Sequence, residues 1–296
     1  MNKDQTWAKL LVSLRQELKT LPDKPEENPE TTLKALWFKA AGDAKSAGAA
    51  AALTVPELTA EQGEVLLALV AQRLSGTPLA HITGWQQFMG VDMPVGPQAL
   101  VPRQETELLG RAALQLLADT AGTDLRIIDV CTGAGNLAVA IAMHEPRARV
   151  FAADLSGDAV ALALRNVKAH HLEHQVTVRE GDLLAPFAAE EFHGKVNLLI
   201  CNPPYISTAK VGTMVAEISA YEPRLAFDGG PFGVKILHRL MTEAPVFLRP
   251  GGWLAFEVGL GQGRAMERRL NKRHDYRQVR RVLDHNGNIR VLLAQV

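Results

Sequence analysis

Residues 126–142 read RIIDVCTGAGNLAVAIA, and this stretch decides the fold class. It opens with a short apolar run, passes through a turn that holds Gly133 and Gly135, and ends in an apolar segment of helical length. The two glycines let the backbone turn tightly and approach a ligand closely. A buried strand that runs through a glycine turn into a helix is the start of a βαβ unit.

The same alternation continues to the C-terminus and predicts the rest of the sheet. Seven candidate strands, most of them apolar enough to be buried on both faces, span 126–131, 148–155, 175–183, 195–202, 252–259, 277–284 and 288–296. Helical segments at 135–146, 156–171 and 233–248 fall between several of the first five strands. We therefore expect an α/β domain with a doubly wound, mostly parallel, Rossmann-like sheet.

The chain before this sheet has a different pattern. Apolar residues recur at helical spacing in 7–14 and 57–74, and the run AAGDAKSAGAAAAL (40–53) is interpreted as a surface helix or loop. Aromatic and β-branched residues between glycines and prolines at 80–102 predict a short hairpin. The sequence thus predicts an N-terminal helical domain at 1–78, a β-hairpin linker at 79–102 and the α/β domain at 103–296.

Composition excludes several classes of function. The 296 residues carry 32 basic and 32 acidic side chains, without the basic excess of a protein that binds nucleic acid stably. Cys131 and Cys201 lack C-x-x-C spacing, so neither a disulfide framework nor a zinc site is predicted. The sequence shows no signal peptide and no apolar run of about 18 residues. We expect a soluble cytoplasmic protein with no metal and no membrane partner.

The loops that follow the first three predicted strands are suited to a nucleoside. The ligand of an open α/β sheet lies beyond the carboxyl ends of its strands. Asp154 ends the second strand, where an acid would receive the two ribose hydroxyls, although it could instead cap the helix that follows. Asp182 and Leu183 end the third strand and suit the edge and face of an adenine. A missing G-x-G-x-x-G motif favours a nucleoside without phosphates over a dinucleotide.

The fourth strand ends in the most specific motif of the chain, CNPPY at 201–205. Two consecutive prolines end the strand, so their carbonyl oxygens can be held toward one point. Asn202 Oδ1 and the Pro203 carbonyl can accept the two hydrogens of an NH₂ group, while Tyr205 packs on its plane. We interpret Asn202, Pro203, Pro204 and Tyr205 as the catalytic residues of methyl transfer to a planar nitrogen.

About three-quarters of the chain, from Pro78 to Val296, resembles the HemK/PrmC family of protein-glutamine N-methyltransferases. The matching segments are PLAHITGWQQFMG (78–90), ALVPRQETELL (99–109), DVCTGAGNLAVAIA (129–142), AADLSGDAVALALRN (152–166), CNPPYI (201–206), YEPRLAFDGGPFGVKIL (221–237) and FEVGLGQG (256–263). The resemblance implies a class I fold that uses S-adenosylmethionine and releases S-adenosylhomocysteine. It implies that the substrate is the glutamine of a Gly-Gly-Gln loop in peptide chain release factors. Separately, we expect the chain to be a monomer.

By this resemblance Cys131, Thr132, Gly133, Ala134, Gly135, Asp154, Leu183 and Asn202 would contact the cofactor, and we add Asp129 and Asp182, which end the first and third predicted strands, as candidate cofactor-binding residues. Arg103, Thr106 and Glu107 match the family's Pro-Arg-x-x-Thr-Glu stretch near the active site, although helix capping and surface ion pairing would also explain them. The first seventy residues match the family poorly, and that region helps such enzymes to hold their protein substrate. The resemblance is therefore firmer for the chemistry than for the substrate.

Four alternatives stay open from the sequence. The acceptor could be a glutamine of a large-subunit ribosomal protein, since 264–281 carries eight basic and two acidic residues that could touch RNA. It could be the nitrogen or oxygen of a small biosynthetic intermediate. An Asn-Pro-Pro-Tyr loop also suits exocyclic base amines in DNA, but the balanced charge disfavours that substrate. A binding module without enzymatic activity would need no such loop opposite a cofactor site.

Overall fold

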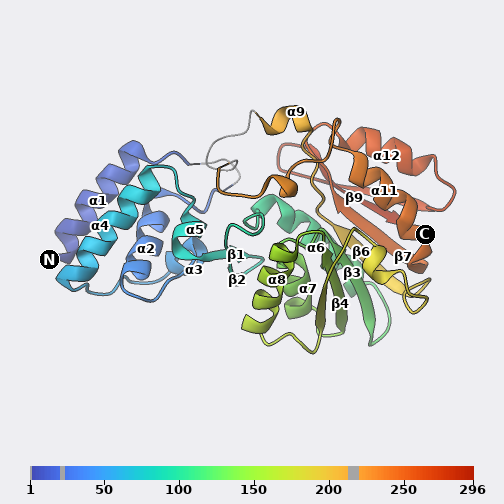
Figure 1. Cartoon of the computed structure of the whole chain (residues 1–296), viewed down its shortest axis with the longest axis horizontal. Coiled ribbons are helices and arrows are strands. Elements are labelled where there is room, and N and C mark those ends of the chain that lie inside the picture. The colour runs from blue at the N-terminus through green and yellow to red at the C-terminus, as the bar shows by residue number, and fades with distance from the viewer. Residues whose placement is uncertain (1, 21–23, 213–219) are drawn as a thin grey trace. The chain divides into compact units, whose positions relative to one another are not determined.

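A computed structural model describes residues 2–20, 24–212 and 220–296 of the chain (Figure 1). The chain divides into two compact units. The first comprises residues 1–97, 101–104 and 215–222, and the second comprises 98–100, 105–214 and 223–296. Each unit has its own hydrophobic core.

The first unit consists of helices and one hairpin. Its elements are α1 (Lys3–Glu17), α2 (Pro29–Ala40), α3 (Ala47–Ala51), α4 (Ala60–Leu74), α5 (Leu79–Thr83), β1 (Trp85–Phe88) and β2 (Val91–Pro94). Asn28 caps α2 by accepting from two backbone amides, and Pro29 occupies its first turn, which is a standard helix start. Sequence periodicity alone did not identify this helix, because seven of its twelve residues are buried and it has little polar face.

The second unit is built on a seven-stranded sheet in the order β5-β4-β3-β6-β7-β9-β8. The strands are β3 (Leu125–Val130), β4 (Ala148–Asp154), β5 (Val176–Glu180), β6 (Val196–Cys201), β7 (Leu248–Glu257), β8 (Gln278–Leu283) and β9 (Ile289–Gln295). The first five pair in parallel, and β9 pairs antiparallel with both neighbours. The seven predicted strands and the mostly parallel sheet are confirmed.

Helices and short turns connect the strands of this unit. They are η1 (Gln104–Thr106), α6 (Glu107–Ala118), α7 (Asn136–His144), α8 (Gly157–Ala169), η2 (Ala185–Phe187), α9 (Thr208–Val211), η3 (Arg224–Ala226), α11 (Lys235–Glu243), η4 (Ala244–Val246) and α12 (Gly263–Asn271). Among the described residues, no helix is long and apolar enough to cross a membrane.

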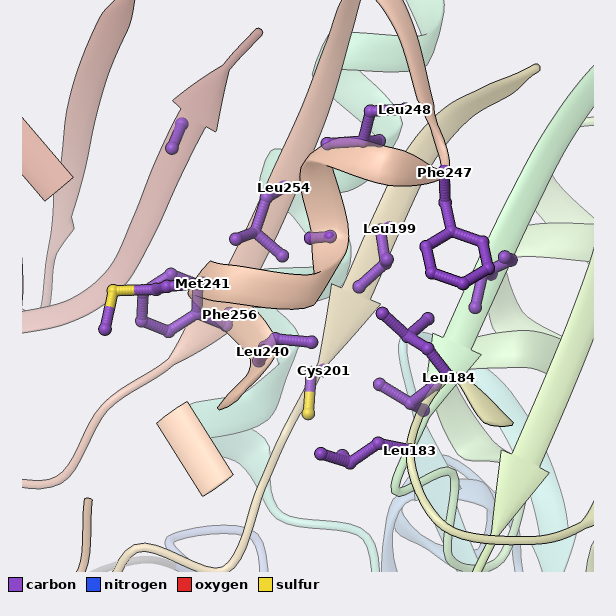
Figure 2. Packing of buried hydrophobic residues seen from close by; sticks show 14 of the residues in the cluster. Leu183, Leu184, Leu199, Cys201, Leu240, Met241, Phe247, Leu248, Leu254 and Phe256 are labelled. Carbon is purple, nitrogen blue, oxygen red and sulfur yellow. The ribbon is translucent and has the colours of Figure 1, made fainter. Parts of the chain in front are cut away.

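Alternation along the strands decides which side chains enter which face of the sheet. Leu199, Cys201, Leu254 and Phe256 lie in one core with Leu240 of α11 (Figure 2). Because successive side chains of a strand point to opposite faces, the residues next to these in sequence turn away from that core. Glu257 follows Phe256, and Asp129 lies between Ile128 and Val130 of the same core; both carboxyl side chains are fully buried. Two carboxyl groups are thereby buried at the ends of β3 and β7.

Candidate active site

The carboxyl ends of four neighbouring strands bring the predicted site residues to one edge of the sheet. Val130 of β3 pairs with Ala153 of β4 on one side and with Cys201 of β6 on the other. Cys201 pairs in turn with Phe256 of β7. The residues that follow these pairs, Cys131, Asp154, Asn202 and Glu257, are therefore neighbours along the edge where α/β sheets bind ligands.

The turn after β3 is held from two directions. Gly133 and Gly135 have φ of 56° and 76°, in the region that favours glycine. The Thr132 amide donates to the Ala153 carbonyl at 3.0 Å, and Asn166 Nδ2 of α8 donates to the Ala134 carbonyl at 2.7 Å. The turn is thus a fixed backbone cradle that leads directly into the N-terminus of α7.

Two acids of different surroundings flank this cradle. Asp129 is fully buried, and burial raises its pKa to about 7, while the Thr132 hydroxyl donates to its Oδ2 at 2.6 Å. Asp154 Oδ2 accepts from the Gly133 amide at 2.8 Å, and its Oδ1 accepts from the Ser156 amide at 3.0 Å. Burial also raises the pKa of Asp154. Ser156, rather than Asp154, is the N-cap of α8, so Asp154 does not act as that cap.

Asp182 and Leu183 lie beyond the end of β5 in different environments. The Asp182 carboxylate forms an exposed ion pair with Arg239 of α11 at 2.8 Å. Leu183 has φ of 49° and is buried in the core shown in Figure 2. The Asp182 side chain is therefore engaged away from the cradle, which leaves its backbone and Leu183 as the nearer candidates for an adenine contact.

The Asn-Pro-Pro-Tyr loop after β6 packs closely on the glycines of 228–233. A Cβ built on Gly229 would lie 2.5 Å from the Pro204 carbonyl oxygen. One built on Gly233 would lie still closer to the Tyr205 carbonyl oxygen. Gln262 Nε2 donates to that same carbonyl at 2.9 Å. The loop conformation is therefore set by contacts that only glycine permits at these two positions.

A buried polar network lies behind Asn202 and Tyr205. Asn202 Nδ2 donates to Thr106 Oγ1 at 2.9 Å, and Thr106 Oγ1 donates to Glu257 Oε2 at 2.8 Å. The Tyr205 hydroxyl donates to Glu257 Oε1 at 2.9 Å. Arg290 Nη2 lies 3.3 Å from Glu257 Oε1 and 2.8 Å from Glu105 Oε2. The network joins the predicted catalytic loop to η1, β7 and β9.

Ionisation in this network is shifted by burial. Burial raises the pKa of Glu257 to about 7, with the Glu105 charge adding to the rise and Thr106, Arg290 and Tyr205 opposing it. Burial also raises the pKa of the Tyr205 phenol well above its usual value, so this ring stays neutral. Sequence reasoning singled out neither Glu257 nor Arg290. The available signal was a charged residue inside each of two otherwise apolar strands, LAFEV and IRVLL.

The other two residues matched to the family's Pro-Arg-x-x-Thr-Glu stretch form ion pairs. Glu107 forms an i,i+4 ion pair with Arg111 at 2.7 Å. Arg103 belongs to the first unit, where it forms a buried ion pair with Glu222 at 2.6 Å.

This sheet order, with a glycine cradle after β3 and an Asn-Pro-Pro-Tyr loop after β6, defines a class I S-adenosylmethionine-dependent methyltransferase. A family model described as "Methyltransferase small domain" matches residues 109–230. The solved METTL16 methyltransferase domain shares the fold, with a TM-score of 0.52 at 18% identity over 70% of this chain and 89% of that one.

Curated relatives place the chain more closely. It is 38% identical to the release factor glutamine methyltransferase of Moorella thermoacetica, over 83% of this chain and 88% of the relative. It is 40% identical to the protein of the same name from Xylella fastidiosa, over 72% of this chain and 75% of the relative. The chain belongs to the release factor glutamine methyltransferase family.

Proposed function

We propose that this chain transfers a methyl group from S-adenosylmethionine to the side-chain amide nitrogen of the glutamine in the Gly-Gly-Gln motif of peptide chain release factors. One observation carries the proposal: Asn202 Nδ2 donates a hydrogen bond to Thr106 Oγ1 at 2.9 Å. The Asn202 Oδ1 is then the atom that can accept a hydrogen from an incoming group. An acceptor suits an amide NH₂, and the relatives are named for glutamine methylation.

The cofactor-binding residues of the proposal come from the end of β3, the turn after it, and the ends of β4, β5 and β6. They are Asp129, Cys131, Thr132, Gly133, Ala134, Gly135, Asp154, Asp182, Leu183 and Asn202. The fit rests on Asp154, whose Oδ2 accepts the Gly133 amide and whose Oδ1 accepts the Ser156 amide. A carboxylate has about four lone-pair sites, so the group can still accept a ribose hydroxyl.

The bound cofactor supplies an electrophilic methyl group on a positively charged sulfur. An amide nitrogen is a poor nucleophile because its lone pair is delocalised, so the task of the protein is to orient it. Asn202 Oδ1 and the Pro203 carbonyl accept its two hydrogens and stabilise the positive N–H dipoles that grow during transfer. Pro204 and the neutral Tyr205 ring hold the amide plane.

The test measures methyl transfer from labelled S-adenosylmethionine to a purified, unmethylated release factor. The comparison substrate is the same factor with its Gly-Gly-Gln glutamine replaced by alanine. We expect the intact factor to be labelled and the variant to stay unlabelled. Labelling of both factors, or of neither with the cofactor bound, would refute the proposed acceptor.

A matched pair of variants assigns the chemistry to the loop. Asn202→Ala is expected to lower kcat by on the order of 100-fold or more, because one preorganised acceptor is lost. Asn271→Ala removes an exposed asparagine of α12 and is expected to leave kcat unchanged. Near-normal turnover of the Asn202→Ala variant would refute the assignment.

The proposal extends to substrate recognition and setting. Residues 1–78 would recognise the release factor, with the hairpin region 79–102 linking them to the catalytic domain at 103–296. The enzyme would act as a cytoplasmic monomer that forms no stable complex with nucleic acid. A single monomer mass in light scattering, and no retention on RNA at 0.15 M salt, are the expected results.

A second candidate is a glutamine of a large-subunit ribosomal protein. Arg264, Arg268, Arg269, Lys272, Arg277, Arg280 and Arg281 are exposed on α12, β8 and the segment before β8. Such a cluster could contact ribosomal RNA. Labelling of ribosomal protein in place of the release factor would favour this candidate.

A further inference from the structure

Three side chains of the second unit form a continuous hydrogen-bonded chain that ends at Asn202. Glu257, Thr106 and Asn202, here called the orienting chain, are linked at 2.8 Å and 2.9 Å. Glu257 and Thr106 are 0% and 2% exposed, so water does not compete for these bonds. The three residues come from β7, the end of η1 and the loop after β6.

The direction of each hydrogen bond follows from counting donors. A carboxylate only accepts, and Glu257 Oε1 already receives the Tyr205 hydroxyl. Arg290 can only donate, and it faces that same oxygen. The single Thr106 proton therefore goes to Glu257 Oε2. Thr106 Oγ1 must then accept from Asn202, which requires the NH₂ end of the Asn202 amide.

The opposite orientation of the Asn202 amide is unfavourable. It would set Asn202 Oδ1 against the Thr106 lone pairs at 2.9 Å, so a buried hydrogen bond would be lost. A lost buried bond shifts the ratio of the two orientations by about 10- to 100-fold.

We propose that Glu257 and Thr106 are positioning residues, which act through one another to fix the Asn202 amide with its oxygen toward the methyl-accepting nitrogen. The inference rests on the proposed function, because it takes Asn202 Oδ1 as the acceptor of a substrate NH₂. Neither residue touches the substrate in this proposal. Their whole effect passes through the orientation of one amide.

The charges around Glu257 set the pH range of the effect. Glu105 of η1, Arg290 of β9 and the Tyr205 hydroxyl all face the carboxyl group. Its pKa is raised to about 7 by burial. Below that pH the Glu257 carboxyl is protonated and can itself donate to Thr106 Oγ1. The Thr106 hydroxyl is then free to donate to Asn202, so the directions of the two hydrogen bonds are no longer fixed. Turnover is therefore expected to fall below a pH of about 7.

Glu257→Gln is the most direct perturbation, since it keeps the shape and reverses one bond. Arg290 still requires an oxygen opposite it, so the new NH₂ group faces Thr106. Thr106 then accepts from Gln and donates to Asn202, and the Asn202 amide turns over. We expect kcat to fall by about 10- to 100-fold and the part of the pH dependence near 7 that comes from Glu257 to be lost, while Asp129, whose pKa is also raised to about 7, keeps its own part.

Two threonine variants provide matched controls within the same chain. Thr106→Val keeps the volume and removes the hydroxyl, so it should lower kcat to a similar degree. Thr106→Ser keeps the hydroxyl and should restore most of the activity. Glu173→Gln, the same chemical change at an exposed position before β5, should leave kcat and its pH profile unchanged.

A double-mutant cycle separates positioning from a general structural effect. If Glu257 acts through Asn202, then Glu257→Gln should lower kcat in the wild-type background and change it less than twofold in the Asn202→Ala background. The proposal would be overturned if Glu257→Gln lowered kcat by the same factor in the wild-type and Asn202→Ala backgrounds. It would also be overturned if Glu257→Gln and Thr106→Val both kept kcat within twofold of wild type.

A measurement without substrate keeps this inference distinct from the proposed function. The ¹⁵N–¹H signals of the Asn202 NH₂ group can be assigned by their loss in Asn202→Ala. They should shift in Glu257→Gln and Thr106→Val and stay near their wild-type positions in Thr106→Ser. If the wild-type protein labels no release factor, the proposed function fails; unmoved NH₂ signals in both variants overturn the orienting chain.

Discussion

Replacing Gly135 by alanine should destabilise the second unit through two separable effects. Gly135 has φ of 76°, and an L residue in this region costs about 1–2 kcal/mol, offset in part by the stiffer unfolded chain. A Cβ there would also lie 3.0 Å from Ala163 Cβ and 3.3 Å from Ala163 Cα of α8. Overpacking of this kind costs roughly a further 1–3 kcal/mol. We expect a total of about 2–4 kcal/mol.

Gly287 provides the matched control, because it has φ of 79° and nothing within 4 Å of an added Cβ. Gly287→Ala should lower the free energy of unfolding by only about 1 kcal/mol. Urea unfolding followed by hydrogen exchange of the β3 and β6 peptides reports on the second unit alone. The displaced cradle should also weaken S-adenosylhomocysteine binding by roughly fivefold or more, the value of one backbone hydrogen bond. Equal destabilisation by the two substitutions would refute the packing argument.

Three further predictions concern buried charges. The pKa of Glu257 is raised from 4.5 to about 7, so the folded protein binds an extra proton between these pH values. Its contribution to the free energy of unfolding is complete below pH 4.5 and is lost as pH rises through 7, a fall on the order of 3 kcal/mol. Glu257→Gln should remove this part of the fall in urea unfolding and leave the part that comes from Asp129, whose pKa is likewise raised to about 7. Arg103→Met should cost about 3–5 kcal/mol in thermal unfolding by removing the ion-pair partner of buried Glu222. Adding Glu222→Gln should recover most of this loss, and no recovery would contradict the ion-pair account. Asp154→Asn should weaken S-adenosylhomocysteine binding about 10- to 100-fold in calorimetry by removing one acceptor oxygen, whereas exposed Asp158→Asn should not, and equal effects of the two would contradict a specific role.

Much of the second unit could be predicted because its signals are local. Each parallel strand is a short, nearly continuous apolar run, and the helices between them have regular spacing, so neither needs knowledge of distant residues. The helix α2 was not identified because its local pattern lacks the alternation of apolar and polar faces. Its residues Leu33, Leu36 and Trp37 are almost fully buried alongside Ala35 and Phe38, and this leaves little polar face for periodicity to detect. Its Asn-Pro start at 28–29 was the usable signal.

The sequence by itself determined the order of the strands along the chain in the second unit, the glycine turn at 133–135 and the residue types of the loop at 202–205. These features depend on neighbouring residues and on the rule that ligands lie at the carboxyl ends of parallel strands. Only the tertiary structure decided which residues, distant in sequence, form hydrogen bonds with the side chains of this loop. Thr106, Glu257 and Arg290 come from separate elements, and no spacing along the chain encodes their meeting. The pKa values of Glu257 and Arg290 depend on burial and on the neighbouring charges, and the hydrogen-bond directions depend on which groups donate. These conditions arise only when the strands are packed.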